Sequence, residues 1–176
     1  MKKIIIPLLI LVALIIRFVY VNNDQNKLKK LYNNPIKINE YYENYIYAEY
    51  KDHVTIMYYQ GDEKEVIIPE KINNKPVYSI DDSAFYGNSK IEKIVIPNKV
   101  IRIGHQAFIG NRNLTEVTLP DNLIEIGPYS FDVCPKLKKI NVKKGSKTEK
   151  ALKKTKFYDL INYIWYNKEE VFKWKN

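Results

Sequence analysis

Three short segments of the chain place apolar residues at their first, fourth and sixth positions, with mostly polar residues between them. They read IEKIVIP from Ile91, LTEVTLP from Leu114 and LKKINVK from Leu137. Side chains alternate across a strand, so the fourth and sixth residues of each segment lie on the same face. The pattern predicts three similar short strands, each turning its apolar residues toward a common core.

The unit around these strands is repeated at an offset of 23 residues. The stretches VIPNKVIRIGHQAF, from Val95, and VTLPDNLIEIGPYSF, from Val117, carry Phe108 and Phe131 in the same place (131 − 108 = 23). An earlier copy ends at Phe85 (108 − 85 = 23). Repetition at this period predicts a solenoid of stacked coils. The other pairs at this offset are Ile96 with Leu119, Pro97 with Pro120, Ile103 with Ile126 and Gly104 with Gly127.

Each repeat also predicts how the chain leaves its strand and returns to the core. Pro97 ends the strand because proline cannot donate a ladder hydrogen bond, and Val100 and Ile103 then turn inward again. Gly104 permits a turn, after which the ring of Phe108 fills the space where a helix would otherwise pack. Burial gains roughly 1.5 to 3 kcal/mol per apolar side chain, whereas ordering costs about 1 to 2 kcal/mol per residue. A single repeat is therefore unstable alone, and stacking is obligatory.

The run VIIPEKINNKPVYSIDDSAFYGNSKIEKIVIPNKVIRIGHQAF, from Val66, resembles the BspA-like leucine-rich repeat family, the Treponema type with repeats of about 23 residues. The hallmark is I-P, then V-x-x-I, then A-F before the next leucine, and the resemblance covers residues 45–157. Asp81 stands where the family has glycine, and Ser130 where it has alanine. The resemblance implies a short leucine-rich repeat solenoid of about 3–4 repeats, with parallel strands joined by short turns and helical pieces.

Family membership would further imply caps at both ends and a location outside the cytoplasm. The expected caps are a β-hairpin at the N-terminal end and a small α/β cap at the C-terminal end. The family consists of exported bacterial surface proteins that bind other macromolecules, and some members adhere to host matrix proteins or to other bacteria. Because a fold does not specify its ligand, the resemblance names no partner for this chain.

The N-terminal sequence MKKIIIPLLILVALIIRFVYVNN predicts a signal anchor over residues 1–21. Its apolar run is long enough for a signal peptide, but bulky residues stand at 18–21, where cleavage requires small ones. Eighteen residues, 4–21, make a helix of roughly 27 Å against a hydrocarbon core of about 30 Å. We therefore expect a single-pass membrane protein with its repeats outside the cytoplasm; secretion after signal cleavage is the alternative.

The remaining segments are predicted to flank and cap the solenoid. Ala151 and Leu152 turn inward from a short amphipathic helix, and the last residues alternate aromatic and polar side chains as a hairpin would. The predicted domains are a linker over 22–44, a capping hairpin over 45–60, leucine-rich repeats over 61–142 and a C-terminal cap over 143–176.

Charge and candidate chemistry exclude several classes of function. The chain has a formal net charge of +9, but residues 61–142 hold 11 basic and 11 acidic side chains, so the repeats carry no basic stripe for nucleic acid. Cys134 falls in a column with Asn88 and Asn111, a structural turn position, and no metal or cofactor site is readable. No phosphate-binding loop, zinc motif or catalytic triad occurs. We expect a protein that is not an enzyme.

The exposed strand positions are the first candidate binding surface. The residues at the third position of successive strand segments alternate between negative and positive charge. This column is either a recognition surface or a solvated ladder of ion pairs that fixes the strand register. The fifth-place column changes from apolar to polar, and its apolar end is a candidate patch. The third-place residues are Glu65, Lys93, Glu116 and Lys139, and the fifth-place residues are Ile67, Val95, Thr118 and Asn141. Of these, Ile67, Val95, Thr118, Asn141, Lys93 and Glu116 form the candidate sheet face.

Aromatic residues at the ends of the domain are the second candidate surface. Seven of the 15 tyrosines lie between positions 41 and 59. Tyr45 and Tyr47, together with Trp174 near the C-terminus, either cover the open core or form a contact surface, since tyrosine gives large contact area at little entropic cost.

Two hypotheses follow from the sequence. The first is a non-catalytic, adhesin-like protein-interaction module tethered to the bacterial membrane through residues 1–21, which binds a protein or glycan at the cell surface. The alternative is a structural or assembly scaffold subunit of the cell envelope with no external ligand.

Overall fold

The structure is a computed structural model that describes residues 23–29 and 35–164. The chain divides into two units, Met1–Asn33 and Asn34–Asn176. In the first unit, residues 23–29 are helical. Within the described ranges, no helix combines the length and the apolar character that crossing a bilayer requires. The predicted anchor, residues 1–21, lies outside the described residues.

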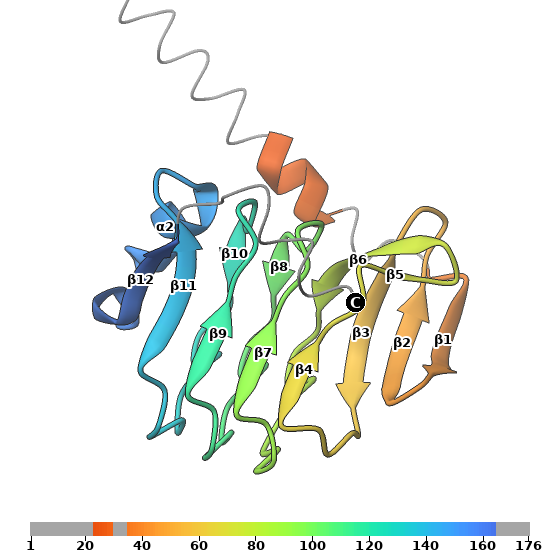
Figure 1. Cartoon of the computed structure of the whole chain (residues 1–176). Helices are drawn as coiled ribbons and strands as arrows, with labels where there is room; N and C mark the ends of the chain where they lie inside the picture. The colour runs from red at the N-terminus through yellow and green to blue at the C-terminus, as the bar shows by residue number, and fades with distance from the viewer. Residues whose placement is uncertain (1–22, 30–34, 165–176) are drawn as a thin grey trace, which may run out of the picture. The chain divides into compact units, whose positions relative to one another are not determined.

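The second unit is a parallel β-solenoid with an antiparallel hairpin region at its N-terminal end (Figure 1). One sheet has the strand order β1-β2-β3-β6-β8-β10, with β5 beside β6, and the other has the order β12-β11-β9-β7-β4. The strands are β1 Lys37–Tyr42, β2 Tyr45–Glu49, β3 Val54–Tyr59, β4 Glu65–Ile67, β5 Lys71–Ile72, β6 Lys75–Ile80, β7 Lys93–Val95, β8 Arg102–Ile103, β9 Glu116–Thr118, β10 Glu125–Ile126, β11 Lys139–Lys143 and β12 Ile161–Ile164. Helix α2 spans Lys147–Leu152 and the 3₁₀-helix η1 spans Tyr158–Leu160.

The 23-residue repeat corresponds to one coil of the solenoid. Three coils contribute one strand to each sheet, and β7, β9 and β11 pair in parallel at offsets of 23, with Lys93 opposite Glu116 and Lys139 opposite Glu116. The solenoid has about five turns, one for each strand of the five-stranded sheet. The predicted 3–4 repeats were too few because β12 continues the stacking without the proline that follows β4, β7 and β9.

The core is a set of residue columns that run along the solenoid. Phe85, Phe108 and Phe131 stack at the turn that follows each strand of the first sheet, with ring centroids 4.9 Å and 5.3 Å apart. Tyr59 extends the stack at the N-terminal end at 4.9 Å, and Phe157 meets Phe131 edge to face at 5.6 Å at the other end. One coil therefore closes the core of the next, as the instability of a single repeat requires.

Polar residues satisfy the backbone between the coils. The Nδ2 of Asn111 donates hydrogen bonds to the carbonyl oxygens of Phe85 and Phe108, both at 2.7 Å. One coil later, Cys134 Sγ donates to the carbonyl oxygen of Phe108 at 3.2 Å. The predicted column of Asn88, Asn111 and Cys134 therefore has a structural role, since buried carbonyl groups must find donors.

The antiparallel strands β1, β2 and β3 cover the N-terminal end of the core. Tyr45 and Tyr47 of β2 are buried with Val54 and Ile56 of β3. The structure places strand β1 at residues 37–42, within the predicted linker over 22–44. Strand β1 pairs with β2 through a register shift between Lys37 and Glu40, which breaks the simple alternation of side chains.

Helix α2 and strand β12 cover the C-terminal end. Ser146 caps the helix by accepting a hydrogen bond from the backbone N–H of Glu149 at 3.0 Å, and the Glu149 carboxylate accepts one from Gly145 at 2.6 Å. Leu152 is fully buried, as predicted, whereas Ala151 is half-buried. Strand β12 pairs in parallel with β11; the predicted hairpin over the last residues extends beyond the described part of the chain.

Candidate functional site

The five-stranded sheet carries the charged column that the sequence predicted. Register pairs Glu65 with Lys93, Lys93 with Glu116, and Glu116 with Lys139. The ammonium group of Lys93 lies 2.7 Å from the Glu65 carboxylate, and both side chains are about half exposed. Because opposite charges on adjacent strands attract, this column favours the observed register, while its exposure leaves it accessible to a ligand.

The apolar end of the neighbouring column is also exposed. Ile67 of β4 and Val95 of β7 are register partners, with 57% and 39% of their surfaces accessible. Thr118 of β9 continues the row and is half-buried. Two exposed aliphatic side chains, side by side and bordered by charges, form a small contact surface on the sheet.

Asn141, the last residue of this column, was predicted to be exposed, and that prediction was wrong. Only 6% of its surface is accessible. Its Nδ2 donates to Glu116 Oε1 at 2.6 Å and to Thr118 Oγ1 at 3.1 Å, while its Oδ1 accepts from Asn162 at 2.7 Å. Asn141 is buried because β12 places Asn162 directly beside it, so its amide links the strands and does not face solvent.

The aromatic cap is closed and does not present Tyr45 and Tyr47 as a contact surface. Their accessible fractions are 5% and 1%. The Tyr47 hydroxyl accepts a hydrogen bond from Asn73 at 2.8 Å, and the Tyr45 ring packs against that of Tyr59 with centroids 5.1 Å apart. Both side chains therefore cover the core, which is the capping interpretation. Trp174, the third residue of this predicted surface, lies outside the described residues.

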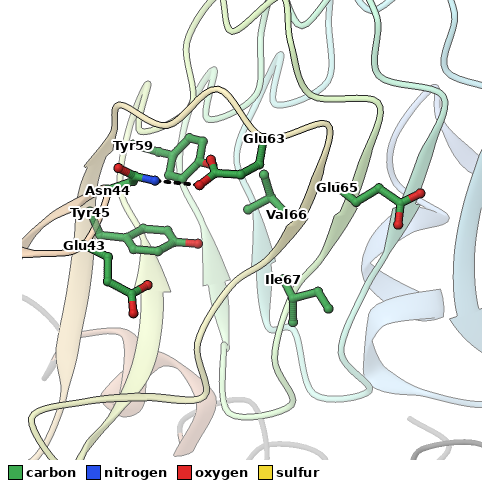
Figure 2. Close-up of a pocket in the computed structure, with 8 residues that line it drawn as sticks. All are labelled: Glu43, Asn44, Tyr45, Tyr59, Glu63, Glu65, Val66 and Ile67. Atoms are coloured by element: carbon green, nitrogen blue, oxygen red, sulfur yellow. Dashed lines mark hydrogen bonds between the residues drawn. The ribbon is translucent and has the colours of Figure 1, made fainter. Parts of the chain in front are cut away.

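A polar notch lies beside β4, where the antiparallel cap meets the first coil (Figure 2). Its volume is about 170 Å³. The Glu63 side chain lies across it, accepting hydrogen bonds from the Tyr59 hydroxyl and from Asn44 Nδ2, the latter at 2.6 Å. The lining residues are Glu43, Asn44, Tyr45, Tyr59, Glu63, Glu65, Val66 and Ile67.

The notch is electrostatically negative. Its lining includes three carboxylates and no basic side chain. The hydrogen bond from Tyr59 is the main cause that lowers the pKa of Glu63, so this carboxylate is charged at neutral pH. Burial, together with that same bond to Glu63, raises the pKa of Tyr59, which stays protonated and remains a donor.

Sequence reasoning missed this notch, although one signal was present. Gly61 and Glu63 stand in the segment GDE between the cap and the first coil. A side chain at position 61 would collide with the Glu63 carboxylate and with the Tyr59 hydroxyl, so glycine is required there for Glu63 to reach across the notch. In the sequence alone, a glycine two residues before a carboxylate does not indicate a notch, because the notch depends on where the neighbouring strands lie.

Metal-binding clusters and reactive thiols are two kinds of reactive centre that the described residues lack. Among them, no cluster of three histidine, cysteine or acidic side chains could hold a metal ion. Cys134 is buried, and burial raises the pKa of its thiol to about 11. A protonated, buried thiol is a poor nucleophile. The exposed sheet face and the acidic notch are both accessible to a ligand.

The coils with L-x-x-L-x-L strands and stacked phenylalanines define a leucine-rich repeat solenoid. The family model for the BspA type leucine rich repeat region matches residues 59–167 in six copies. The chain belongs to this family.

Solved structures of leucine-rich repeat proteins agree with this assignment. The leucine rich repeat protein of T. pallidum is 31% identical, with a TM-score of 0.55, over 57% of this chain and 48% of that one. A leucine rich cell surface protein from Faecalibacterium prausnitzii is 26% identical, with a TM-score of 0.50, over 62% of this chain and 34% of that one. A leucine-rich repeat protein from Bacteroides capillosus is 25% identical, with a TM-score of 0.58, over 63% of this chain and 86% of that one.

This chain covers about half the length of the T. pallidum protein and about a third of the F. prausnitzii protein, at 48% and 34%. Among curated proteins, none matches the chain significantly.

Proposed function

We propose that this chain is a non-catalytic binding module that recognises a protein or a glycan at the bacterial cell surface through the exposed face of its five-stranded sheet. Residues 1–21 would tether it to the membrane with the repeats outside the cytoplasm. Cleavage of this segment would instead release the module. Its similarity to a leucine rich cell surface protein supports this location.

The observation that carries the proposal is the exposed pair Ile67 and Val95. Apolar side chains on a solvated sheet cost solubility and contribute nothing to the core, whereas their burial under a ligand stabilises a complex. Lys93 and Glu116 border the pair with opposite charges, and such a border gives a ligand orientation and specificity.

Lysine substitutions on this face test the proposal. The purified chain would be applied to arrays of glycans and of immobilised extracellular peptides. Val95→Lys and Thr118→Lys should each weaken the strongest interactions by at least about tenfold, which corresponds to 1.4 kcal/mol. Tyr86→Lys is the matched control, because Tyr86 is an exposed aromatic residue in a turn outside the sheet. Binding that neither face variant weakens would refute the role of the sheet face.

The location has a separate test. Protease would be added to intact cells that express the full chain with a C-terminal epitope, and the mass of the membrane-bound form would be measured. Loss of the epitope together with retention of residues 1–21 is the expected result. A protected epitope would place the repeats in the cytoplasm and contradict the proposal.

One observation favours the alternative function, an assembly subunit of the envelope. Strand β1 lies at the end of its sheet, and Ile36, Ile38 and Tyr41 in and before it are exposed at 60%, 59% and 68%. An apolar edge strand is a surface for self-association. Analytical ultracentrifugation that shows a monomer at micromolar concentration would exclude self-assembly of the chain through this edge.

A further inference from the structure

Strand β4 has a free edge. Among the described strands it pairs only with β7. The Lys64 carbonyl oxygen accepts a hydrogen bond from Lys93 N at 3.0 Å, and Ile68 N donates to the Val95 carbonyl oxygen at 3.0 Å. Successive peptide groups of a strand point in opposite directions, so the N–H and C=O groups of the intervening Glu65 and Ile67 point away from β7. Within the described ranges, none of these four groups makes a hydrogen bond.

The free edge opens onto the acidic notch. Glu65 and Ile67 line the notch as well as bearing the free peptide groups. The Glu63 side chain lies across the notch, and Glu43 stands on the side of the cap (Figure 2). The Glu65 carboxylate is paired with Lys93 on the sheet face, whereas that of Glu63 accepts only neutral donors, Tyr59 and Asn44. The notch therefore combines unused strand hydrogen bonds with uncompensated negative charge.

We infer that the β4 edge binds an extended peptide segment of a partner protein, which adds to the sheet as a further strand and places a lysine or arginine side chain in the notch. Main-chain hydrogen bonds to Glu65 and Ile67 give affinity, and the notch selects the side chain. The inference rests on the proposed function as a binding module, but it concerns the edge of the sheet and not its face.

The chemistry of the notch specifies a basic side chain. A volume of about 170 Å³ is well above the roughly 10–15 Å³ that one water molecule needs, so a single long side chain fits. An ammonium or guanidinium group would form charge-assisted hydrogen bonds with Glu63 and Glu43. A metal ion is disfavoured, since no three potential ligands in the described part of the chain come together.

Peptide selectivity is the first test. Acetylated and amidated seven-residue peptides that alternate valine and threonine would carry lysine, arginine, norleucine or glutamate at the centre. Fluorescence anisotropy with the full chain should show lysine and arginine peptides binding at least about tenfold more tightly than the norleucine peptide, and the glutamate peptide not at all. Glu63→Gln should abolish the preference for lysine over norleucine. Equal binding of all four peptides would overturn the inference.

Two substitutions of Ile67 distinguish the contribution of its backbone N–H from that of its side chain. Ile67→Pro removes an outward N–H without removing a bond to β7, and should reduce binding of the lysine peptide at least about tenfold. Ile67→Thr keeps the N–H and changes only the side chain that lines the notch, so it should weaken binding clearly less than Ile67→Pro does. Circular dichroism would establish that both variants fold. A loss of affinity in Ile67→Thr equal to that in Ile67→Pro would contradict strand addition.

A change in the peptide makes the test independent of protein folding. N-methylation of alternate residues removes N–H groups on one edge of the bound peptide only. Methylating the residues that face β4 should abolish binding, and methylating those between them should not. Equal effects of the two methylation patterns would overturn the inference.

The outcome is distinguishable from that of the proposed function. Val95→Lys lies on the sheet face and should leave peptide binding at the edge within about threefold, even where it abolishes binding to the array. A dimer of the chain that Ile67→Pro dissociates would assign the edge to a second copy and would overturn the assignment to a partner protein.

Discussion

The side-chain amide of Asn111 donates a hydrogen bond of 2.7 Å to the carbonyl oxygen of Phe85, one coil earlier in the solenoid. The same Nδ2 reaches the carbonyl oxygen of Phe108 within its own coil. One buried amide therefore joins two coils and satisfies two backbone acceptors, and Asn111 is fully buried in doing so.

Substituting Asn111 by alanine should leave the Phe85 carbonyl group buried without a donor, while the Phe108 carbonyl group keeps only the weak thiol donor of Cys134. An unsatisfied buried acceptor costs about 1–3 kcal/mol, so Asn111→Ala is expected to lower the free energy of unfolding by about that amount. Urea denaturation would measure it. Asn98→Ala, at an exposed asparagine, is the control and should change stability by less than about 0.5 kcal/mol.

Substituting Val133 by glycine should stabilise the chain. Val133 occupies the place of Gly87 and Gly110 in the repeat (133 − 110 = 23) and shares their left-handed backbone, with φ of 57°. A side chain costs about 1–2 kcal/mol there, and more if it is β-branched. After the greater entropy of unfolded glycine is subtracted, Val133→Gly should gain about 0.5–1 kcal/mol. Val133→Thr keeps the branching and should gain nothing; equal midpoints for the two variants would refute the explanation.

Substituting Gly127 by alanine should be far more harmful than substituting Gly87. A Cβ at position 127 would lie 2.5 Å from the carbonyl carbon of Gly104, whereas one at position 87 has nothing within 4 Å. Gly127→Ala must move the backbone of the neighbouring coil, at roughly 3 kcal/mol or more. Gly87→Ala pays only for its positive φ, about 1–2 kcal/mol. Thermal unfolding of both variants checks the order.

Alkaline pH should destabilise the chain through Cys134. Burial raises the pKa of its thiol from 9.0 to about 11. The unfolded chain therefore releases this proton first, and the contribution to stability that is present below pH 9 is lost as pH rises toward 11. Cys134→Asn keeps a donor in the column and removes the titration. The wild type should lose roughly 1–2 kcal/mol more than this variant between pH 8 and pH 10.5; parallel curves would contradict the shift.

The same burial protects the thiol from modification. In the folded chain at pH 8, iodoacetamide should label Cys134 slowly, and labelling should become rapid in denaturant. Fast labelling of the folded chain, measured by mass spectrometry, would show that Cys134 is accessible.

The sequence predicted the coils well, because each coil repeats the same physical requirements. Phe85, Phe108 and Phe131 stack as their common offset indicated, and the strand residues Lys93 and Glu116 are register partners. A column needs the same residue type in every coil, so the repeat period alone identifies which residues lie beside one another.

The ends of the solenoid were less predictable, because each end occurs only once. The repeat pattern predicted an exposed Asn141, but β12 lies beside it and buries it. The residues of β12 lack the repeat motif, so the sequence does not predict a parallel strand there. The acidic notch depends on where the cap leaves the first coil, which no periodicity records. Glu63 was therefore not recognised, although it is charged and lies across the notch.

The charged and aliphatic columns on the sheet face contribute nothing to the contacts inside the coils. Evolution or an engineer can therefore duplicate a block such as residues 97–119, which spans 23 positions, without redesigning the interior. Each duplication would move the two ends apart by one strand spacing, about 4.8 Å. The number of repeats would then set the distance between a ligand at the edge of β4 and a partner at the C-terminal cap.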